Sequence, residues 1–268
     1  MRKRSFVSAG LAVLAAVLSV LSILFVTPSA SAAVGPYVAL GDSYSSGVGT
    51  RTYYADSGSC YRSAYAYPVL TAQAIGAPLT FAACSGAKVP NVLNQLGGLS
   101  AATAYVTVSV GGNDAGFADV ITSCARPWPW TCWGDITNSN NYIRATLPGA
   151  LDNLYAQIRS RAPNARVVVV GYPRVFNGEE CNVGARISNG EQVELNNTAN
   201  LLATTIAGRA AAAGFRYADP RAAFTGHAVC DDVEWINGLS NPILESYHPN
   251  RSGHSAGYAP LVRPLLTG

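Results

Sequence analysis

Short runs of apolar and β-branched residues alternate along the chain with longer segments of helical spacing, and each run stops at a glycine or a polar turn. Runs of this kind are typical of strands that are buried on both faces of a parallel sheet. The five predicted strands cover residues 37–40, 79–82, 105–110, 166–170 and 215–218.

Helical spacing predicts the segments between these strands. Leu147, Leu151, Leu154 and Ile158 fall on one side of a helix expected over residues 142–161. The other expected helices cover residues 64–75, 88–96, 115–121, 189–213 and 255–266. Residues 124–140, rich in Trp and Pro, are expected to form an insert that Cys124 and Cys132 hold.

Strands that alternate with helices indicate an α/β fold with a mostly parallel sheet covered on both faces. A chain of 268 residues can build one substantial core. Neither an internal repeat nor a low-complexity linker interrupts residues 34–268. We therefore predict a single α/β domain over this range.

The first 33 residues have the parts of a secretory signal peptide: a basic head at residues 2–4, an apolar body at residues 6–26 and a small-residue tail. Ala30 and Ala32 meet the small-residue rule, which predicts cleavage after Ala32 or Ala33. The apolar body is long enough to cross a bilayer, so an uncleaved anchor is the competing interpretation. We expect cleavage, a secreted extracellular protein, and no stable membrane insertion afterwards.

The net positive charge of the chain lies in the basic head. Of 18 Lys and Arg residues, three are Arg2, Lys3 and Arg4, which leaves 15 basic residues against 15 acidic ones. The predicted mature chain is therefore near neutral. No electrostatic basis for nucleic-acid binding remains.

Six cysteines in an exported chain indicate three disulfides, because the environment outside the cytosol is oxidising. Many pairings are possible, and the simplest joins the cysteines in chain order. These pairs are Cys60–Cys84, Cys124–Cys132 and Cys181–Cys230. A zinc site is the alternative, but no Cys-x-x-Cys pair occurs in the chain.

Ser43 follows the first predicted strand, two residues after Gly41. In open α/β sheets the carboxyl ends of the strands face a crevice, and reactive groups collect there. A serine in such a turn also commonly caps the next helix. Taken alone, Ser43 is therefore either a nucleophile or a helix cap.

Gly86 follows the second predicted strand, and Asn113 follows the third. If these strands are neighbours, both residues converge with Ser43 at one edge of the sheet. The Asn113 side-chain amide and the backbone amides of Ser43 and Gly86 could then stabilise an oxyanion. In the structural alternative, Asn113 or Asp114 caps the helix expected at residues 115–121.

A serine nucleophile needs a base within hydrogen-bond reach. The chain has three histidines. His248 lies in an irregular loop, where an imidazole can face a crevice. We expect His227, beside Cys230, to be structural or on the surface, and His254 to begin the closing helix. These considerations predict a pair of Ser43 and His248.

Four ordered blocks of the chain resemble those of the SGNH (GDSL-type) hydrolases. The longer strings around them are similar to the secreted actinobacterial branch of esterases, lipases and phospholipases, and the similarity covers nearly all of residues 34–268. The blocks are Gly41-Asp42-Ser43, Gly86, Gly111-Gly112-Asn113-Asp114 and His248-Pro249.

This resemblance implies a flavodoxin-like three-layer sandwich. It also implies that Ser43 is the nucleophile and His248 the general base, with an oxyanion hole formed by the amides of Ser43, Gly86 and Asn113. Sequential disulfides in this branch would suit the pairing above. No metal or cofactor is expected.

One position departs from the family pattern. The third member of the family's triad is usually an Asp three residues before the His, and this chain has Glu245 there. In the similar secreted branch a backbone carbonyl can take that role, and the carbonyl of Ser246 is our candidate. We therefore predict a Ser43–His248 dyad in which Glu245 is optional.

The resemblance implies acyl transfer from a carboxylic ester, with a lipid acyl ester expected, to water by a monomeric enzyme. An acetyl-esterase on polysaccharide and a non-catalytic secreted binding module on the same scaffold are the alternatives. Aromatic residues of the loops either line an acyl groove or pack the insert and cover the core. They are Tyr44, Tyr53, Tyr54, Phe117, Trp128, Trp130 and Trp133.

Overall fold

The computed structural model describes residues 34–127, 129–181 and 186–268. The predicted signal peptide, residues 1–33, lies outside the described residues, as does Trp128. Within the described ranges, no helix has both the length and the apolar character needed to cross a membrane.

Five parallel strands form one sheet in the order β2-β1-β3-β4-β5. The first three strands are therefore neighbours, with β1 in the middle, as the placement of the polar strand ends requires. This order is that of a flavodoxin-like, doubly wound sheet. The strands are β1 (Tyr37–Gly41), β2 (Leu79–Phe81), β3 (Tyr105–Ser109), β4 (Arg166–Val170) and β5 (Arg216–Ala218).

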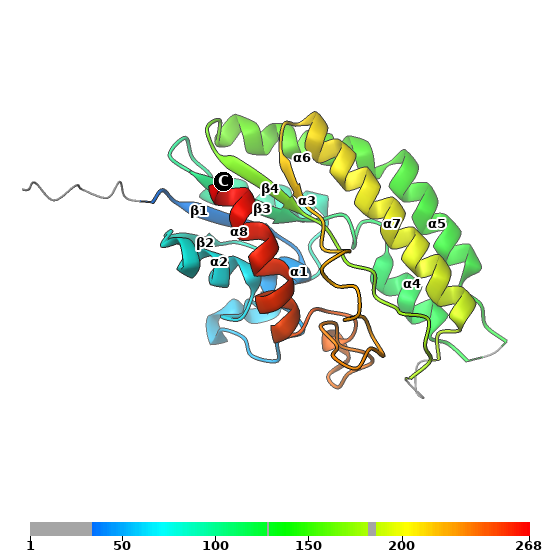
Figure 1. The fold of residues 1–268 in the computed structure, drawn as a ribbon. Helices are drawn as coiled ribbons and strands as arrows, with labels where there is room; N and C mark the ends of the chain where they lie inside the picture. The colour runs from blue at the N-terminus through cyan, green and yellow to red at the C-terminus, as the bar shows by residue number, and fades with distance from the viewer. Residues whose placement is uncertain (1–33, 128, 182–185) are drawn as a thin grey trace, which may run out of the picture. The chain divides into compact units, whose positions relative to one another are not determined.

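Helices cover both faces of the sheet (Figure 1), which confirms the predicted α/β sandwich. On one face α2 packs against α8, which contacts β4 and β5; on the other α6 packs between α3 and α7, with α5 against α6 and α7. The helices are α1 (Ser43–Ser46), α2 (Tyr67–Ile75), α3 (Val89–Asn94), α4 (Phe117–Cys124), α5 (Trp133–Ala145), α6 (Leu147–Arg161), α7 (Asn189–Ala212) and α8 (Ala259–Thr267).

The apolar runs that predicted the strands form the core, because their side chains are buried in the sheet. Every residue of β1 is buried, as are Val167 to Val170 of β4. On α6 the predicted side of Leu147, Leu151 and Leu154 is wholly buried. Removal of these side chains from water is the main contribution that holds the helical layer to the sheet.

The prediction for residues 124–161 was wrong in two respects. The Trp- and Pro-rich insert already becomes helical at Trp133, and the helix predicted over residues 142–161 is two helices, α5 and α6, which meet at Thr146. Pro148 explains the break, because its ring cannot follow a helical residue without a clash and supplies no amide hydrogen. The helical start of α5 carries Asp135 in its first turn, which the helix dipole favours.

The closing helix also differs from the prediction. A π-helical turn, Gly253–Tyr258, runs directly into α8. Three short 3-10 turns complete the described elements: η1 (Ala55–Cys60), η2 (Gln95–Gly98) and η3 (Ile243–Glu245).

All three disulfides in the structure join cysteines in chain order: Cys60–Cys84, Cys124–Cys132 and Cys181–Cys230. The first links the loops that follow β1 and β2, and it lies two residues before Gly86. It therefore ties together two of the strand ends that carry polar residues.

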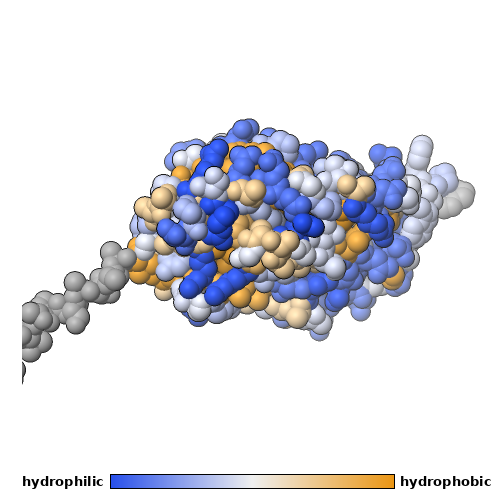
Figure 2. All heavy atoms as spheres, turned by 90° about the horizontal axis from the view of Figure 1, so that it is seen from above, coloured by the Kyte–Doolittle hydropathy of each residue, from blue (hydrophilic) through white to orange (hydrophobic). Residues whose placement is uncertain are grey.

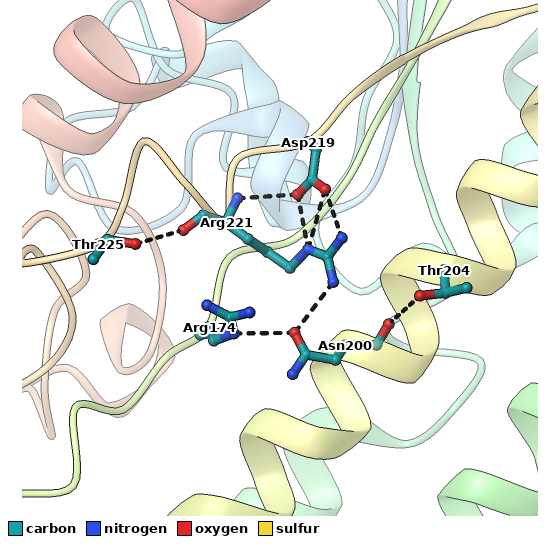
Figure 3. A network of polar contacts seen from close by, with 6 residues as sticks. All are labelled: Arg174, Asn200, Thr204, Asp219, Arg221 and Thr225. Carbon is teal, nitrogen blue, oxygen red and sulfur yellow. Dashed lines mark hydrogen bonds and ion pairs between the residues drawn. The ribbon is translucent and has the colours of Figure 1, made fainter.

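A charged network fastens the loops after β4 and β5 to α7 (Figure 3). The Arg221 guanidinium donates to the carboxylate of Asp219, with Nη2 2.6 Å from Oδ2. The hydrogen bonds from Arg221 lower the Asp219 pKa. The side-chain oxygen of Asn200 accepts from both Arg174 and Arg221, at 3.0 and 3.2 Å. On the face shown in Figure 2, hydrophobic residues form separate areas among hydrophilic ones.

The packing of α6 yields a test of this architecture. Leu154→Ala should lower the free energy of unfolding by about 3 kcal/mol, because it leaves a cavity in a fully buried layer. Asn153→Ala, at the exposed neighbouring position, should change it by less than about 0.5 kcal/mol. Urea denaturation measures both, and equal losses would contradict the assignment of the buried face.

Candidate active site

Ser43 begins α1 directly after β1, at the carboxyl edge of the sheet. Gly41 makes this turn with φ +130°, and a Cβ there would meet the Ser109 carbonyl oxygen at 2.5 Å. Asp42, rather than Ser43, is the helix cap, since its carboxylate accepts the Tyr44 N–H at 3.0 Å. The capping interpretation of Ser43 is therefore wrong. Its hydroxyl is available for another role.

His248 lies against this hydroxyl, with Nε2 2.8 Å from Ser43 Oγ. Its Nδ1 lies 2.9 Å from the carbonyl oxygen of Ser246. A carbonyl only accepts hydrogen bonds, so Nδ1 carries the proton and Nε2 is left to accept from the Ser43 hydroxyl. Burial lowers the His248 pKa to about 4, because it removes water from the charged imidazolium. The hydrogen bond with the Ser246 carbonyl opposes this shift.

The loop that carries His248 is held by a short antiparallel pairing. The Asn237 N–H donates to the His248 carbonyl, and the Tyr247 N–H donates to the Asn237 carbonyl, both at 2.9 Å. The Asn237 side-chain amide donates to the carbonyl oxygens of Gly49, at 2.9 Å, and Glu245, at 3.2 Å. Asn237 thus connects the histidine loop to the loop that follows α1.

Glu245 does not contact the imidazole in the structure. Its side chain is 2% exposed, and Oε1 accepts the Tyr53 hydroxyl at 2.5 Å. Burial and this carboxylate raise the pKa of the Tyr53 hydroxyl well above its ordinary value. The atom beside His248 Nδ1 is therefore the Ser246 carbonyl, our candidate for the orienting group, and Glu245 anchors the same loop to Tyr53.

The predicted oxyanion donors meet at one cavity, which Ser43, Gly86 and Asn113 all line. The first N–H groups of a helix have no partner within the helix, so the Ser43 amide is free of α1. Asn113 donates one side-chain hydrogen to the Ala87 carbonyl at 3.1 Å, which orients its amide and leaves the second hydrogen. Among the described residues, no hydrogen bond uses the Gly86 N–H.

Neither Asn113 nor Asp114 caps α4, as the structural alternative required. That helix begins at Phe117 after Gly116, without a side-chain cap. Asp114 instead accepts the Val89 N–H at the start of α3, at 3.0 and 3.1 Å. It thereby connects the segment after β3 to the segment after β2.

Asp42 is the centre of a buried polar network under Ser43. It is 1% exposed, and its carboxylate accepts from Ser109 Oγ at 2.8 Å and from the Tyr172 hydroxyl. Burial raises the Asp42 pKa to about 6, although these hydrogen bonds oppose the shift. Sequence reasoning assigned no role to Ser109 or Tyr172. The buried polar Ser109, at the carboxyl end of a strand of mostly β-branched residues, was the one available signal.

The cavity at Ser43 has a volume of about 290 Å³ and is lined mainly by apolar side chains. Of the aromatic residues predicted to line a groove, Tyr44 and Phe117 line this cavity, whereas the Tyr53 hydroxyl donates a hydrogen bond to Glu245. Its walls come from the start of α1, the loops after β1, β2, β3 and β4, helices α4 and α7, η3 and the loop of His248. They include Phe117, Ala118, Ile121, Pro173, Ala199, Leu202, Ile243 and Leu244.

Tyr54, Trp130 and Trp133 do not line this cavity and are 41%, 64% and 46% exposed. The groove interpretation of the aromatic residues is therefore wrong for these three. They belong to the loop at η1 and to the segment around the start of α5.

The other two histidines lie away from Ser43. His227 stacks on Trp235 with ring centroids 3.7 Å apart, and its Nδ1 contacts the Val233 carbonyl. His254 is fully buried within the π-helical turn, where it accepts the Tyr67 N–H at 3.2 Å. Burial lowers the His254 pKa to about 3. Both are structural in these surroundings.

Within the described residues, Cys124, Cys132 and Glu191 place three possible metal-ligand atoms close together. The two cysteines form a disulfide, so they offer no thiolate to a metal ion.

Comparisons with known proteins agree with this arrangement. Residues 39–256 match the GDSL-like lipase/acylhydrolase family. Lipase 1 of Streptomyces coelicolor is 47% identical over 236 residues, which is 86% of this chain and 87% of that protein.

Two solved structures share the fold closely. The phospholipase A1 of Streptomyces albidoflavus is 44% identical with a TM-score of 0.83, over 87% of this chain and 99% of that one. The extracellular lipase of Streptomyces rimosus is 42% identical with a TM-score of 0.82, over 87% and 100%. The chain belongs to the GDSL-like lipase/acylhydrolase family and is a carboxylic ester hydrolase.

Proposed function

We propose that the chain is an exported lipid ester hydrolase that works through a Ser43–His248 dyad. The observation that carries this proposal is the 2.8 Å contact between Ser43 Oγ and His248 Nε2 at the wall of an apolar cavity. The lipase and phospholipase relatives support a lipid acyl ester as substrate. The three disulfides and an extracellular relative support export.

In the mechanism, Ser43 attacks the ester carbonyl carbon while His248 Nε2 takes the hydroxyl proton. The imidazolium then gives this proton to the departing alcohol oxygen, which leaves an acyl-enzyme. Water attacks the acyl-enzyme in the same way and releases the acid. The amides of Ser43, Gly86 and Asn113 stabilise the negative oxygen of each tetrahedral intermediate, where one donor contributes about 3–4 kcal/mol.

The Ser246 carbonyl replaces the carboxylate of a full triad in this proposal. Its oxygen holds the Nδ1 proton and therefore selects the tautomer that leaves Nε2 free. As a dipole it stabilises the imidazolium less than a carboxylate does, but the orientation it gives is the same. Glu245 then acts on the loop and not on the proton transfer.

Hydrolysis of p-nitrophenyl esters of graded acyl length, of phosphatidylcholine and of a triglyceride tests the function. Ser43→Ala and His248→Ala should each lower kcat by about 10⁴–10⁶-fold, and the double variant should be no worse, because the two residues act as a unit. Turnover by Ser43→Ala close to that of the wild type would contradict the proposal. Hydrolysis restricted to acetyl esters would instead support the acetyl-esterase alternative.

The pH dependence should report the low pKa of His248. The imidazole must be neutral to accept the proton, so kcat/KM should stay level below pH 6.5 and fall only as the pH approaches about 4. Circular dichroism at each pH checks that the fold persists. Asp42, whose pKa is about 6, also titrates in this range, so its effect on kcat/KM must be distinguished from that of His248. A limb near pH 6 that disappears in Asp42→Asn would contradict the assignment to His248.

Glu245→Gln distinguishes a dyad from a triad. It retains the shape and the acceptor for the Tyr53 hydroxyl, so kcat should fall by less than about tenfold. Tyr53→Phe, which removes this hydrogen bond but leaves the Glu245 carboxylate in place, is the matched control and should also lower kcat by less than about tenfold. A loss of about a thousandfold in Glu245→Gln alone would make Glu245 a working member of the triad.

A further inference from the structure

Ile243 has the most exposed large hydrophobic side chain in the described part of the chain, with 70% of its surface in contact with solvent. It is at the same time part of the wall of the cavity that holds Ser43 and His248. A side chain that both lines the cavity and projects into water lies at the cavity mouth. Solvent exposure of so large an apolar group is unfavourable unless something covers it.

The turn that presents Ile243 is held firmly. The Glu245 N–H donates to the Pro242 carbonyl, and the Ser246 N–H donates to the Ile243 carbonyl, both at 3.0 Å. The buried Glu245 side chain then fixes the turn to Tyr53. Ile243 is therefore preorganised in its exposed position, and little ordering cost accompanies its burial by a partner.

The lining of the cavity carries little charge. Among the described residues that line the cavity, none is a Lys or Arg, and the one carboxylate, that of Asp42, is buried. The exposed lining residues of α4 are Ala118 and Thr122, which are uncharged. An exposed isoleucine next to a largely uncharged cavity lining fits an apolar phase better than an ionic polymer.

We propose that the mouth docks on the surface of a neutral or zwitterionic lipid layer, with Ile243 inserted among the acyl chains. The inference rests on the proposed function, because a lipid layer is the source of the ester that enters the cavity. Insertion removes the isoleucine from water and places the opening toward the lipid. The acyl chain can then pass from layer to cavity along a continuous apolar surface.

Vesicle binding tests the inference without turnover. In a Ser43→Ala background, the protein is sedimented with sucrose-loaded phosphatidylcholine vesicles. Ile243→Ser should weaken partitioning by about tenfold, because most of the apolar transfer energy of one large side chain is lost. Ile243→Leu should retain it. Val233→Ser is the matched control: Val233 lies in the same long segment between β5 and α8, is 59% exposed and does not line the cavity.

Several outcomes would overturn the inference. In the first, the Ser43→Ala protein does not bind the vesicles. In the second, Ile243→Ser leaves the partitioning unchanged, and in the third, Val233→Ser weakens it as much as Ile243→Ser does. A dimer that sedimentation velocity detects, and that Ile243→Ser disrupts without a change in vesicle binding, would assign this face to a second copy instead. Hydrolysis of dissolved p-nitrophenyl butyrate by the wild type is measured separately. Its absence would reject the proposed function, whereas the binding comparison decides the docking surface by itself.

Discussion

The parallel pairing of β1 between β2 and β3 is the constraint on which the site depends. In that pairing Gly41 lies opposite Ser109, so the chain leaves both strands at the same level of the sheet. Ser43, Gly86 and Asn113 follow the three strands by only a few residues and have little freedom to separate. The buried apolar side chains of the sheet thus set the geometry of the proposed oxyanion donors, and a shift of register would move Ser43 away from the other two.

His248 reaches the site by different means, because it belongs to no strand of the sheet. Backbone pairing with Asn237 holds its loop, and two side-chain links, from Asn237 to Gly49 and from Tyr53 to Glu245, connect that loop to the loop after α1. His248 is therefore positioned against Ser43 by contacts with the neighbours of Ser43 in the chain. Movement of one loop would carry the other with it, which preserves the short contact between Oγ and Nε2.

Burial acts on both titratable groups near Ser43, in opposite senses. It raises the pKa of Asp42 and lowers that of His248, since in each case the charged form loses solvation. For His248 the result is a neutral imidazole near pH 7. For Asp42 the carboxylate remains ionised near pH 7 only with the help of its three hydrogen-bond donors, which also brace the start of α1.

The sequence by itself determined the five strands, most helices and the three strand ends, because apolar periodicity and turn residues are local signals. It also indicated His248 as the histidine that lies against Ser43. It misplaced the boundary at Thr146, where Pro148 outweighed a continuous apolar pattern, and for Ser43 taken alone it left open whether the residue was a nucleophile or a helix cap. Only the tertiary structure decided the group beside His248 Nδ1, since Ser246 and Glu245 are adjacent in sequence. The same holds for the buried contacts of Asp42 with Ser109 and Tyr172, which join segments far apart in the chain. Such long-range contacts depend on how layers pack, and no local pattern records them.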